Sequence, residues 1–275
     1  MHPHETRPWA RAWAEVHDGE LVELVEYGDD GGALLRLVRL PDGSFRSPRY
    51  AGVTAFGSVL TAERCAVTLR ERLVELGGPV HVRGCPTRPG QPLAALGPVT
   101  DLGPTVVVDV ARDETAAWAR LAAGVRRDIA RARRDGWWAR SWARGELGFA
   151  DALGTAAAIA ARAGKPWPAS AHVLALEGPV PEVQVHLAMN ADGTPGAACL
   201  TVSVDDHADL WASAYEPAFA RENPSKLCHW HMLRRFAGGL VPLGGPAGTE
   251  PDALFAYKLR LGGRVTSDLI VRLES

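Results

Sequence analysis

The amino-acid sequence predicts a mixed α+β fold, and three observations support this prediction. Residues 20–27 and 33–40 alternate apolar and polar side chains around a Gly-Asp-Asp-Gly-Gly turn, which is the pattern of a β-hairpin. Three further strands follow one another between residues 183 and 214. Elsewhere, apolar residues recur with helical spacing, as they do at 60–76. Antiparallel hairpins that lead into strand–helix–strand units are typical of the α+β class.

The first part of the chain, residues 1–103, is expected to fold as one domain. After the hairpin, the helix at 60–76 ends before two glycines, and residues 80–83 are expected to form a strand. The segment 85–104 is rich in proline and glycine and has weak periodicity. We therefore expect a long loop or a domain boundary in this segment.

The second part of the chain, residues 104–265, is expected to form a second domain of strands and helices. The predicted strands cover 105–110, 137–143, 183–189, 196–204, 208–214 and 240–243. The predicted helices cover 113–134, 149–163, 224–236 and 251–261. A last strand is expected at 268–273, and the segment 266–275 is a candidate to complete the sheet of the first domain.

Composition and charge exclude several classes of protein. The formal net charge is −2, so any site for a polyanion must come from local clustering of charge. Hydrophobic residues make up 47% of the chain, enough to form packed cores. No apolar run approaches the roughly 20 residues that span a bilayer. The N-terminal segment lacks the hydrophobic core of a secretory signal. We expect a cytoplasmic protein without a membrane span.

The four cysteines lack the spacing of a zinc site or of a disulfide framework. They stand at positions 65, 85, 199 and 228. His229 and His231, which follow Cys228, invite a metal-site interpretation. A His-x-His pair on a helix, however, directs its two rings apart. We expect no bound metal and ordinary packing of all four thiols.

The predicted helix at 118–134 separates into an apolar face and a basic face. The apolar stripe consists of Trp118, Leu121, Val125, Ile129 and Ala132. Arg127, Arg131 and Arg134 gather on the opposite side. Two interpretations stay open. The arginines form a solvated helix face, or they form a ridge that binds phosphate groups through guanidinium forks.

The start of the helix at 224–236 has a pattern that also suits anion binding. Asn223 in the cap position and Pro224 in the first helical position are a standard start signal. The backbone N–H groups of such a helix end, with Ser225 and Lys226 in the first turn, can hold an anion. Helix capping alone explains Asn223 and Pro224, whereas Lys226 suggests a ligand.

Lys258 is the strongest single candidate for a functional residue. Only three of the 30 basic Lys and Arg side chains are lysines, namely Lys165, Lys226 and Lys258. Lys258 directly follows Tyr257, near the end of the last predicted helix. An ammonium group beside an aromatic wall can stabilise the oxyanion that forms when an amine attacks an ester. It can equally pair with a phosphate or stay solvated.

Five segments, in this order and spacing, resemble the FemABX group of aminoacyltransferases. They are RRDIARA at 126–132, AACL at 197–200, NPSKLCHW at 223–230, the glycine pair at 244–245 and YKLRLGG at 257–263. The loop SPRYAG at 47–52 is also similar to a loop in the first domain of that group. The chain departs from the pattern at Tyr257, where Phe is usual, and at Leu261, which replaces a second aromatic residue.

The resemblance implies two acetyltransferase-like (GNAT-like) domains, the first one reduced, with the reaction centre in the second. It implies transfer of an amino acid from aminoacyl-tRNA to an amine, without a further cofactor. The acceptor would be a small natural-product amine or a peptidoglycan precursor. The implied catalytic residues are Lys258 and Tyr257. The implied substrate-binding residues are Tyr50, Trp211, Tyr215, Ser225, Lys226 and His229. The implied tRNA phosphate-binding residues are Arg127, Arg131 and Arg134.

A coenzyme A-dependent N-acyltransferase of the same fold is the main alternative, with acetyl-CoA or another acyl-CoA as the donor. Such enzymes bind the pyrophosphate with a Gly-rich turn between a strand and a helix. The equivalent turn here contains Pro224, which has no N–H to donate, and Glu222, which repels a pyrophosphate. A binding protein that has kept the fold without the reaction is a third class, and Lys258 argues against it.

Overall fold

The computed structural model describes residues 5–48, 51–87, 91–168, 173, 181–205, 207–246 and 251–274. The chain divides into two compact units. Unit 1 consists of Met1–Thr105, Leu174–Pro181 and Thr266–Ser275, and unit 2 of Val106–Val173 and Glu182–Val265. Strands β6 (Val99–Asp109) and β12 (Gly263–Leu273) each contribute residues to both units.

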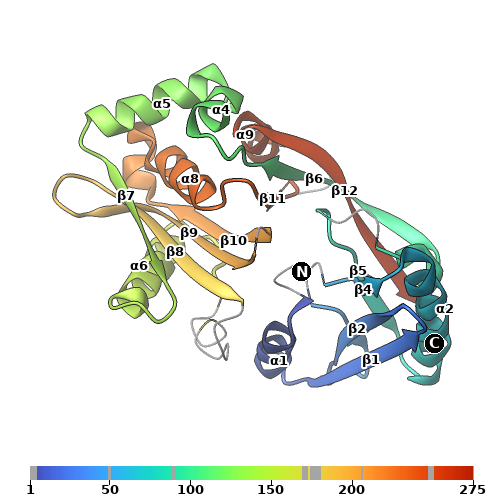
Figure 1. The fold of residues 1–275 in the computed structure, drawn as a ribbon. Helices are drawn as coiled ribbons and strands as arrows, with labels where there is room; N and C mark the ends of the chain where they lie inside the picture. Colours follow the sequence, from blue (N-terminus) through green and yellow to red (C-terminus); the bar gives the residue numbers. More distant parts are fainter. Residues whose placement is uncertain are drawn as a thin grey trace. The chain divides into compact units, whose positions relative to one another are not determined.

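Unit 1 combines a twisted sheet with the long helix α2 (Figure 1). Its elements are α1 (Arg7–Val16), β1 (Glu20–Gly28), β2 (Gly31–Arg39), β3 (Phe45–Arg46), β4 (Val53–Gly57), α2 (Val59–Glu75), β5 (Val80–Arg83) and α3 (Leu93–Leu96). The strand order is β1-β2-β3-β5-β12-β6, and β4 pairs with β2. The hairpin predicted from the sequence is confirmed, since β1 and β2 pair antiparallel from Glu20↔Arg39 to Gly28↔Gly31.

The core of unit 1 forms where α2 packs on β1, β2 and β4. Ser58 caps α2, since its side chain accepts a hydrogen bond from the N–H of Thr61. Leu69 and Leu73 are four residues apart on one face of this helix, and both are almost fully buried. The regularly spaced apolar side chains of α2 thus form the face that packs on the sheet.

Unit 2 is a mixed sheet covered by helices. Its elements are β6 (Val99–Asp109), α4 (Glu114–Arg120), α5 (Ala123–Arg134), β7 (Trp138–Ala143), α6 (Phe149–Arg162), β8 (Glu182–Met189), β9 (Pro195–Val204), β10 (His207–Tyr215), the 3₁₀ helix η2 (Pro217–Glu222), α8 (Pro224–Arg235), β11 (Leu240–Gly244), α9 (Ala253–Arg260) and β12 (Gly263–Leu273). The strand order is β6-β11-β10-β9-β8-β7. Helix α8 lies on one side of this sheet and α6 on the other (Figure 1).

The predicted α+β class is confirmed, with most strands within a few residues of their expected positions. Two differences have local causes. Helix α1 was not predicted, because its apolar stretch is short, although Trp9 is almost fully buried. Strand β6 starts at Val99, inside the proline- and glycine-rich segment expected to be a loop or boundary. Strand β12 pairs antiparallel with β5, for example Ile270↔Arg83.

The single helix expected at 113–134 is wrong, because the chain breaks between α4 and α5. Leu121 has an extended backbone, with ψ 141°, and the N–H of Ala122 donates to the carbonyl of Arg260 at 2.9 Å. This hydrogen bond to α9 replaces a bond within the helix. Leu121 is nevertheless buried in the core of unit 2, so the predicted apolar stripe is retained across the break.

Arg126 stabilises the break between the two helices. Its Nη1 donates to the carbonyl oxygens of Ala119 and Leu121, each at 2.9 Å. Both oxygens belong to the end of α4, where the last carbonyls have no partner within the helix. One guanidinium group thus caps α4 from the first turn of α5.

We expect Arg126→Met to lower the free energy of unfolding by about 1 to 2 kcal/mol, because two carbonyl groups lose a charged donor. Arg127→Met is the matched control. Arg127 is exposed, makes no ion pair with the described residues, and its replacement should change stability by less than about 0.5 kcal/mol. Urea unfolding of both variants measures the difference. Equal stabilities would contradict the capping role of Arg126.

No helix in the described ranges is long and apolar enough to cross a membrane.

Candidate functional site

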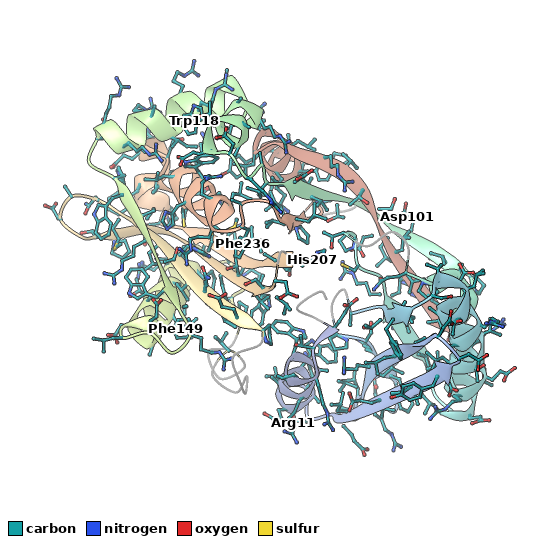
Figure 2. The ribbon with its side chains drawn as sticks, in the orientation of Figure 1. Arg11, Asp101, Trp118, Phe149, His207 and Phe236 are labelled. Carbon is teal, nitrogen blue, oxygen red and sulfur yellow. The ribbon has the colours of Figure 1, made fainter. Side chains whose placement is uncertain are left out.

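Strands β10 and β11 of unit 2 run parallel but share only one ladder pair, His207↔Leu240. His207 stands at the start of β10 (Figure 2). On their other sides, β10 pairs along its length with β9, and β11 pairs with β6. Beyond the single pair, the facing edges of β10 and β11 have no ladder partner within the described part of the chain. Such edges can bond the backbone or amide groups of an extended ligand.

Helix α8 begins shortly after β10 ends, as the sequence predicts. Asn223 is in the cap position and Pro224 in the first turn, but Asn223 has a left-handed backbone and makes no side-chain cap. Its side-chain oxygen instead accepts from Lys226 Nζ at 2.8 Å. Lys226 Nζ also donates to Asp128 at 2.6 Å. The ammonium group expected to hold an anion is therefore engaged by a carboxylate of α5.

His229, one turn into α8, is buried and has a defined tautomer. Its Nδ1 lies 2.7 Å from the carbonyl oxygen of Ser225, which can only accept. Nδ1 therefore carries the proton, and Nε2 has a lone pair. Burial lowers the pKa of His229 to about 4; the Ser225 hydrogen bond opposes this shift, and the charge of Lys258 adds to it. At neutral pH the ring is an uncharged hydrogen-bond acceptor.

Tyr257 and Lys258, on α9, complete the cluster. The Tyr257 hydroxyl is 3.3 Å from His229 Nδ1, and the two rings meet edge to face with centroids 5.6 Å apart. Burial raises the pKa of Tyr257 well above its ordinary value, so it stays a neutral phenol. Lys258 Nζ donates to the carbonyl oxygen of Gly245, just past β11, at 2.5 Å.

This cluster combines a neutral base and a fixed cation. His229 can accept a proton at Nε2, as a general base does. The ammonium of Lys258, held at the end of β11, can stabilise negative charge that develops on an oxygen atom. Both groups belong to unit 2, in which β10 and β11 diverge. The arrangement suits attack of a nucleophile on a carbonyl group.

The structure brings together only part of the predicted site. His229, Tyr257, Lys258 and the carbonyl of Ser225 form the cluster. Trp211 is half-buried in β10, where the register against β9 shifts, and Tyr215, at the end of β10, is 43% exposed. Tyr50 lies outside the described residues.

The three predicted phosphate-binding arginines lie on the exposed face of α5. Arg127 and Arg134 make no ion pair with the described residues. Arg131 Nη2 is 3.7 Å from Asp128 and 3.5 Å from the carbonyl oxygen of Arg221. Asp128, the one acid of this helix, is shared between Arg131 and Lys226. The outer face of α5 therefore keeps a net positive charge.

The sequence did not indicate that the carbonyl group of Gly245 would contact Lys258. The glycine pair at 244–245 was recognised as a segment, but a backbone carbonyl carries no side-chain signal. Its role follows only from the position of Lys258 in space. None of the four cysteines forms a disulfide bond, and all four are buried, in agreement with the packing prediction. Among the described residues, no group of three or more His, Cys, Asp and Glu side chains has the arrangement of a metal site.

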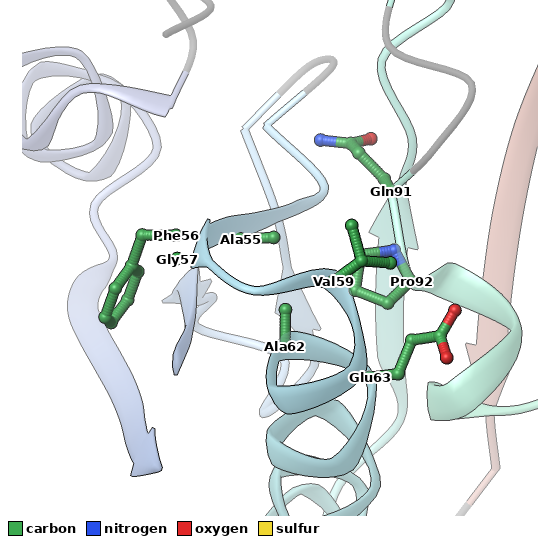
Figure 3. A pocket seen from close by; sticks show the side chains of 8 residues that line it. All are labelled: Ala55, Phe56, Gly57, Val59, Ala62, Glu63, Gln91 and Pro92. Carbon is green, nitrogen blue, oxygen red and sulfur yellow. The ribbon is translucent and has the colours of Figure 1, made fainter. Parts of the chain in front are cut away.

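Unit 1 has its own pocket, of about 340 Å³, between β4, α2 and the segment at Gln91 and Pro92 (Figure 3). Among its eight lining residues, Glu63 is the one titratable side chain. Val59, 70% exposed, contributes to its apolar wall. The pocket offers no pair of acid and base, so we place the chemistry in unit 2.

Comparisons with known proteins agree with this placement. Residues 119–241 match a family model described as an acetyltransferase (GNAT) domain. The fold is similar to that of FemX, with a TM-score of 0.72 over 98% of this chain and 91% of that chain, at 12% identity. The predicted Fem-like, GNAT-type fold is confirmed.

Two further solved structures share the fold. The C-terminal domain of a putative lysylphosphatidylglycerol synthetase from Agrobacterium fabrum has a TM-score of 0.64 at 13% identity, over 98% of this chain and 92% of that chain. L-PGS from Bacillus licheniformis has a TM-score of 0.61 at 11% identity, with the same coverage of 98% and 92%. No curated protein matches the sequence.

The lowered pKa of His229 predicts a dependence of stability on pH. The unfolded chain takes up a proton near pH 6.5, whereas the folded protein does so only near pH 4. The contribution of His229 is therefore complete above pH 6.5 and is lost as the pH falls towards 4. Between pH 7 and 4.5 this loss amounts to about 2 to 3 kcal/mol.

His229→Gln can still donate to the Ser225 carbonyl but does not titrate. Its free energy of unfolding should fall less between pH 7 and pH 4.5 than that of the wild type. Denaturant unfolding at both pH values measures the two changes, and taking the difference between the two pH values within each protein removes any uniform loss of stability. Parallel curves would show that His229 titrates normally.

Proposed function

We propose that this GNAT-fold protein is a Fem-like acyltransferase that moves an amino acid from aminoacyl-tRNA to an amine and forms an amide bond. The acceptor is a small natural-product amine or a peptidoglycan precursor. The observation that carries the proposal is the pairing of Lys258, fixed at the Gly245 carbonyl, with the neutral imidazole of His229. This pair provides the charge and the base that aminolysis of an ester requires.

The reaction needs little covalent chemistry from the protein. The amine nitrogen bonds to the ester carbonyl carbon, and the carbonyl oxygen becomes an oxyanion beside Lys258. His229 Nε2 accepts the proton that the amine loses. As the bond to the ribose oxygen breaks, that oxygen takes up the proton and leaves as a hydroxyl. Positioning of the two substrates and stabilisation of the oxyanion supply most of the rate enhancement.

The choice of donor is supported by the surroundings of α8. Pro224, in the first turn, cannot donate a hydrogen bond to a pyrophosphate. The Glu222 carboxylate is held nearby, where it accepts from the indole Nε1 of Trp137 at 2.9 Å. Both features disfavour coenzyme A at this helix end. The exposed arginines of α5 favour a larger polyanion such as tRNA.

We expect Lys258→Met to slow single-turnover transfer on the order of 10²- to 10³-fold, the usual effect of losing one oxyanion donor. Lys258→Arg should restore only part of the rate, because a planar guanidinium cannot occupy the same point as an ammonium. Lys165→Met, which removes an exposed lysine after α6, is the control and should be neutral. A Lys258→Met rate within a few-fold of the wild type would refute the catalytic role.

Binding of aminoacyl-tRNA should depend steeply on salt through the α5 arginines. Replacing Arg127, Arg131 and Arg134 by Glu should weaken binding and reduce the slope of log Kd against log salt concentration by about two to three. Thermal stability should change little, since all three side chains are exposed.

The matched control replaces three other exposed arginines by Glu, namely Arg39, Arg70 and Arg264, which changes the net charge equally. An equal effect of both triple variants on tRNA binding would show that the arginines of α5 have no specific role in it. Tight binding of acetyl-CoA with no binding of tRNA would replace the proposed donor by coenzyme A.

A further inference from the structure

A second pocket, which lies in unit 2 and has a volume of about 380 Å³, is lined by residues of α4, α5, β7 and α8. Its wall includes Trp138, Trp230, His231, Arg133 and Arg234. Positions 229 and 231 of α8 are about 200° apart around the helix axis, so they face different surroundings. The pocket is therefore separate from the cluster of His229, Tyr257 and Lys258.

Trp138 gives the pocket an accessible aromatic ring. It is 44% exposed, and its indole Nε1 donates to the carbonyl oxygen of Asn190 at 3.1 Å, which fixes the orientation of the ring. Trp230 is only 2% exposed and packs edge to face on Trp118, at 5.2 Å between centroids. Of these rings, Trp138 is the one on which a planar ligand can stack.

Two arginines make the pocket cationic. Arg133 lies 5.8 Å from the ring centre of Trp118, and Arg234 lies 5.8 Å from that of Trp230. The one acid of the pocket, Glu114, is 3.9 Å from Arg234 Nη2. Arg234 Nε is buried and has no hydrogen-bond partner among the described residues. Its Nη1 donates to the carbonyl oxygen of Ala111 at 3.3 Å, which leaves Nη2 as the group that can face an anionic ligand. A guanidinium group suits phosphate oxygens.

His231 ends a chain of hydrogen bonds that leads from the pocket into the sheet. Its Nε2 is 2.9 Å from Ser141 Oγ, which is 2.7 Å from Nδ1 of the buried His186. His186 Nε2 is in turn 2.9 Å from Thr201 Oγ1. Burial, with the charges of Arg235 and Arg133, lowers the pKa of His231, so its ring is neutral at pH 7.

The direction of donation in this series of hydrogen bonds decides whether Nδ1 of His231 can donate to a ligand or accept from it. When Ser141 donates to His231 Nε2, the proton of the ring is on Nδ1, which then acts as a donor. When the chain runs the other way, Nε2 carries the proton and Nδ1 becomes an acceptor. His231 can therefore bond either kind of group on the polar edge of a planar ligand.

We propose that this pocket binds one unpaired nucleotide of the tRNA donor. This identification of the ligand rests on the proposed function. The base stacks on Trp138, its edge bonds to His231, and its phosphate pairs with Arg133 and Arg234. Unpaired RNA bases bind by this combination of aromatic stacking, edge hydrogen bonds and arginine. Helix α5 connects the pocket with the rest of the tRNA surface, since it carries both Arg133 and the exposed Arg127, Arg131 and Arg134.

Binding of a fluorescein-labelled single-stranded RNA, 5′-ACCA-3′, tests the proposal without any transfer reaction. Trp138→Ala should weaken binding about tenfold or more, as the loss of one stacked base does. Trp142→Ala, four residues further along the same edge strand and outside the pocket, is the matched control and should bind within twofold of the wild type. Arg133→Gln should lower both the affinity and the salt dependence.

Equal binding by wild type, Trp138→Ala and Arg133→Gln, all folded by circular dichroism, would overturn the proposal. A loss of coenzyme A binding in Trp138→Ala without a loss of RNA binding would overturn it in favour of the other nucleotide source. Transfer assays separate it from the proposed function. If the wild type fails to transfer from aminoacyl-tRNA, the proposed function is wrong. If it transfers and Trp138→Ala binds and transfers equally well, only the subsite is wrong.

Discussion

The candidate site of unit 2 depends on the early divergence of β10 and β11. Their single ladder pair, His207↔Leu240, leaves the later backbone groups of both strands without each other as partners. Unpaired backbone groups are costly when they are buried, so each needs another partner. Just past the end of β11, the carbonyl oxygen of Gly245 accepts a hydrogen bond from the ammonium of Lys258. A cation on a flexible four-carbon chain is thus held near the end of a strand, which limits the positions that its ammonium group can take.

The state of the base follows from the same surroundings. His229 projects from a helix that starts after β10, and its Nδ1 donates to the carbonyl of Ser225 one turn earlier. With Lys258 close by, a second positive charge on His229 is disfavoured, which adds to the effect of burial on its pKa. Burial is the main cause of the lowered pKa of His229, and the nearby charge of Lys258 acts in the same direction.

The sequence predicted those elements that depend on residues close to one another in the chain. The apolar stripe that includes Val125 and Ile129 is buried, and α8 begins at Asn223 and Pro224 as expected. Features that depend on distant residues were missed. The break before α5 is fixed by a hydrogen bond to the carbonyl of Arg260. Lys226 is bound by Asp128, which is 98 residues away in the sequence. The sequence suggested Lys258 as a site residue because lysine is rare in this chain. Its partner, the backbone carbonyl of Gly245, gives no comparable signal in the sequence.

The two histidines of α8 lie in different surroundings, although they belong to one helix. The His-x-His spacing argues against a shared metal because the rings diverge, and this divergence directs the rings to different neighbours. His229 meets Tyr257 and the carbonyl of Ser225, while His231 meets Ser141 on the edge strand β7. Both rings are neutral because of burial, but they differ in what holds them. A backbone carbonyl fixes the tautomer of His229, as a base requires. A hydroxyl can donate or accept, so it leaves both tautomers of His231 open.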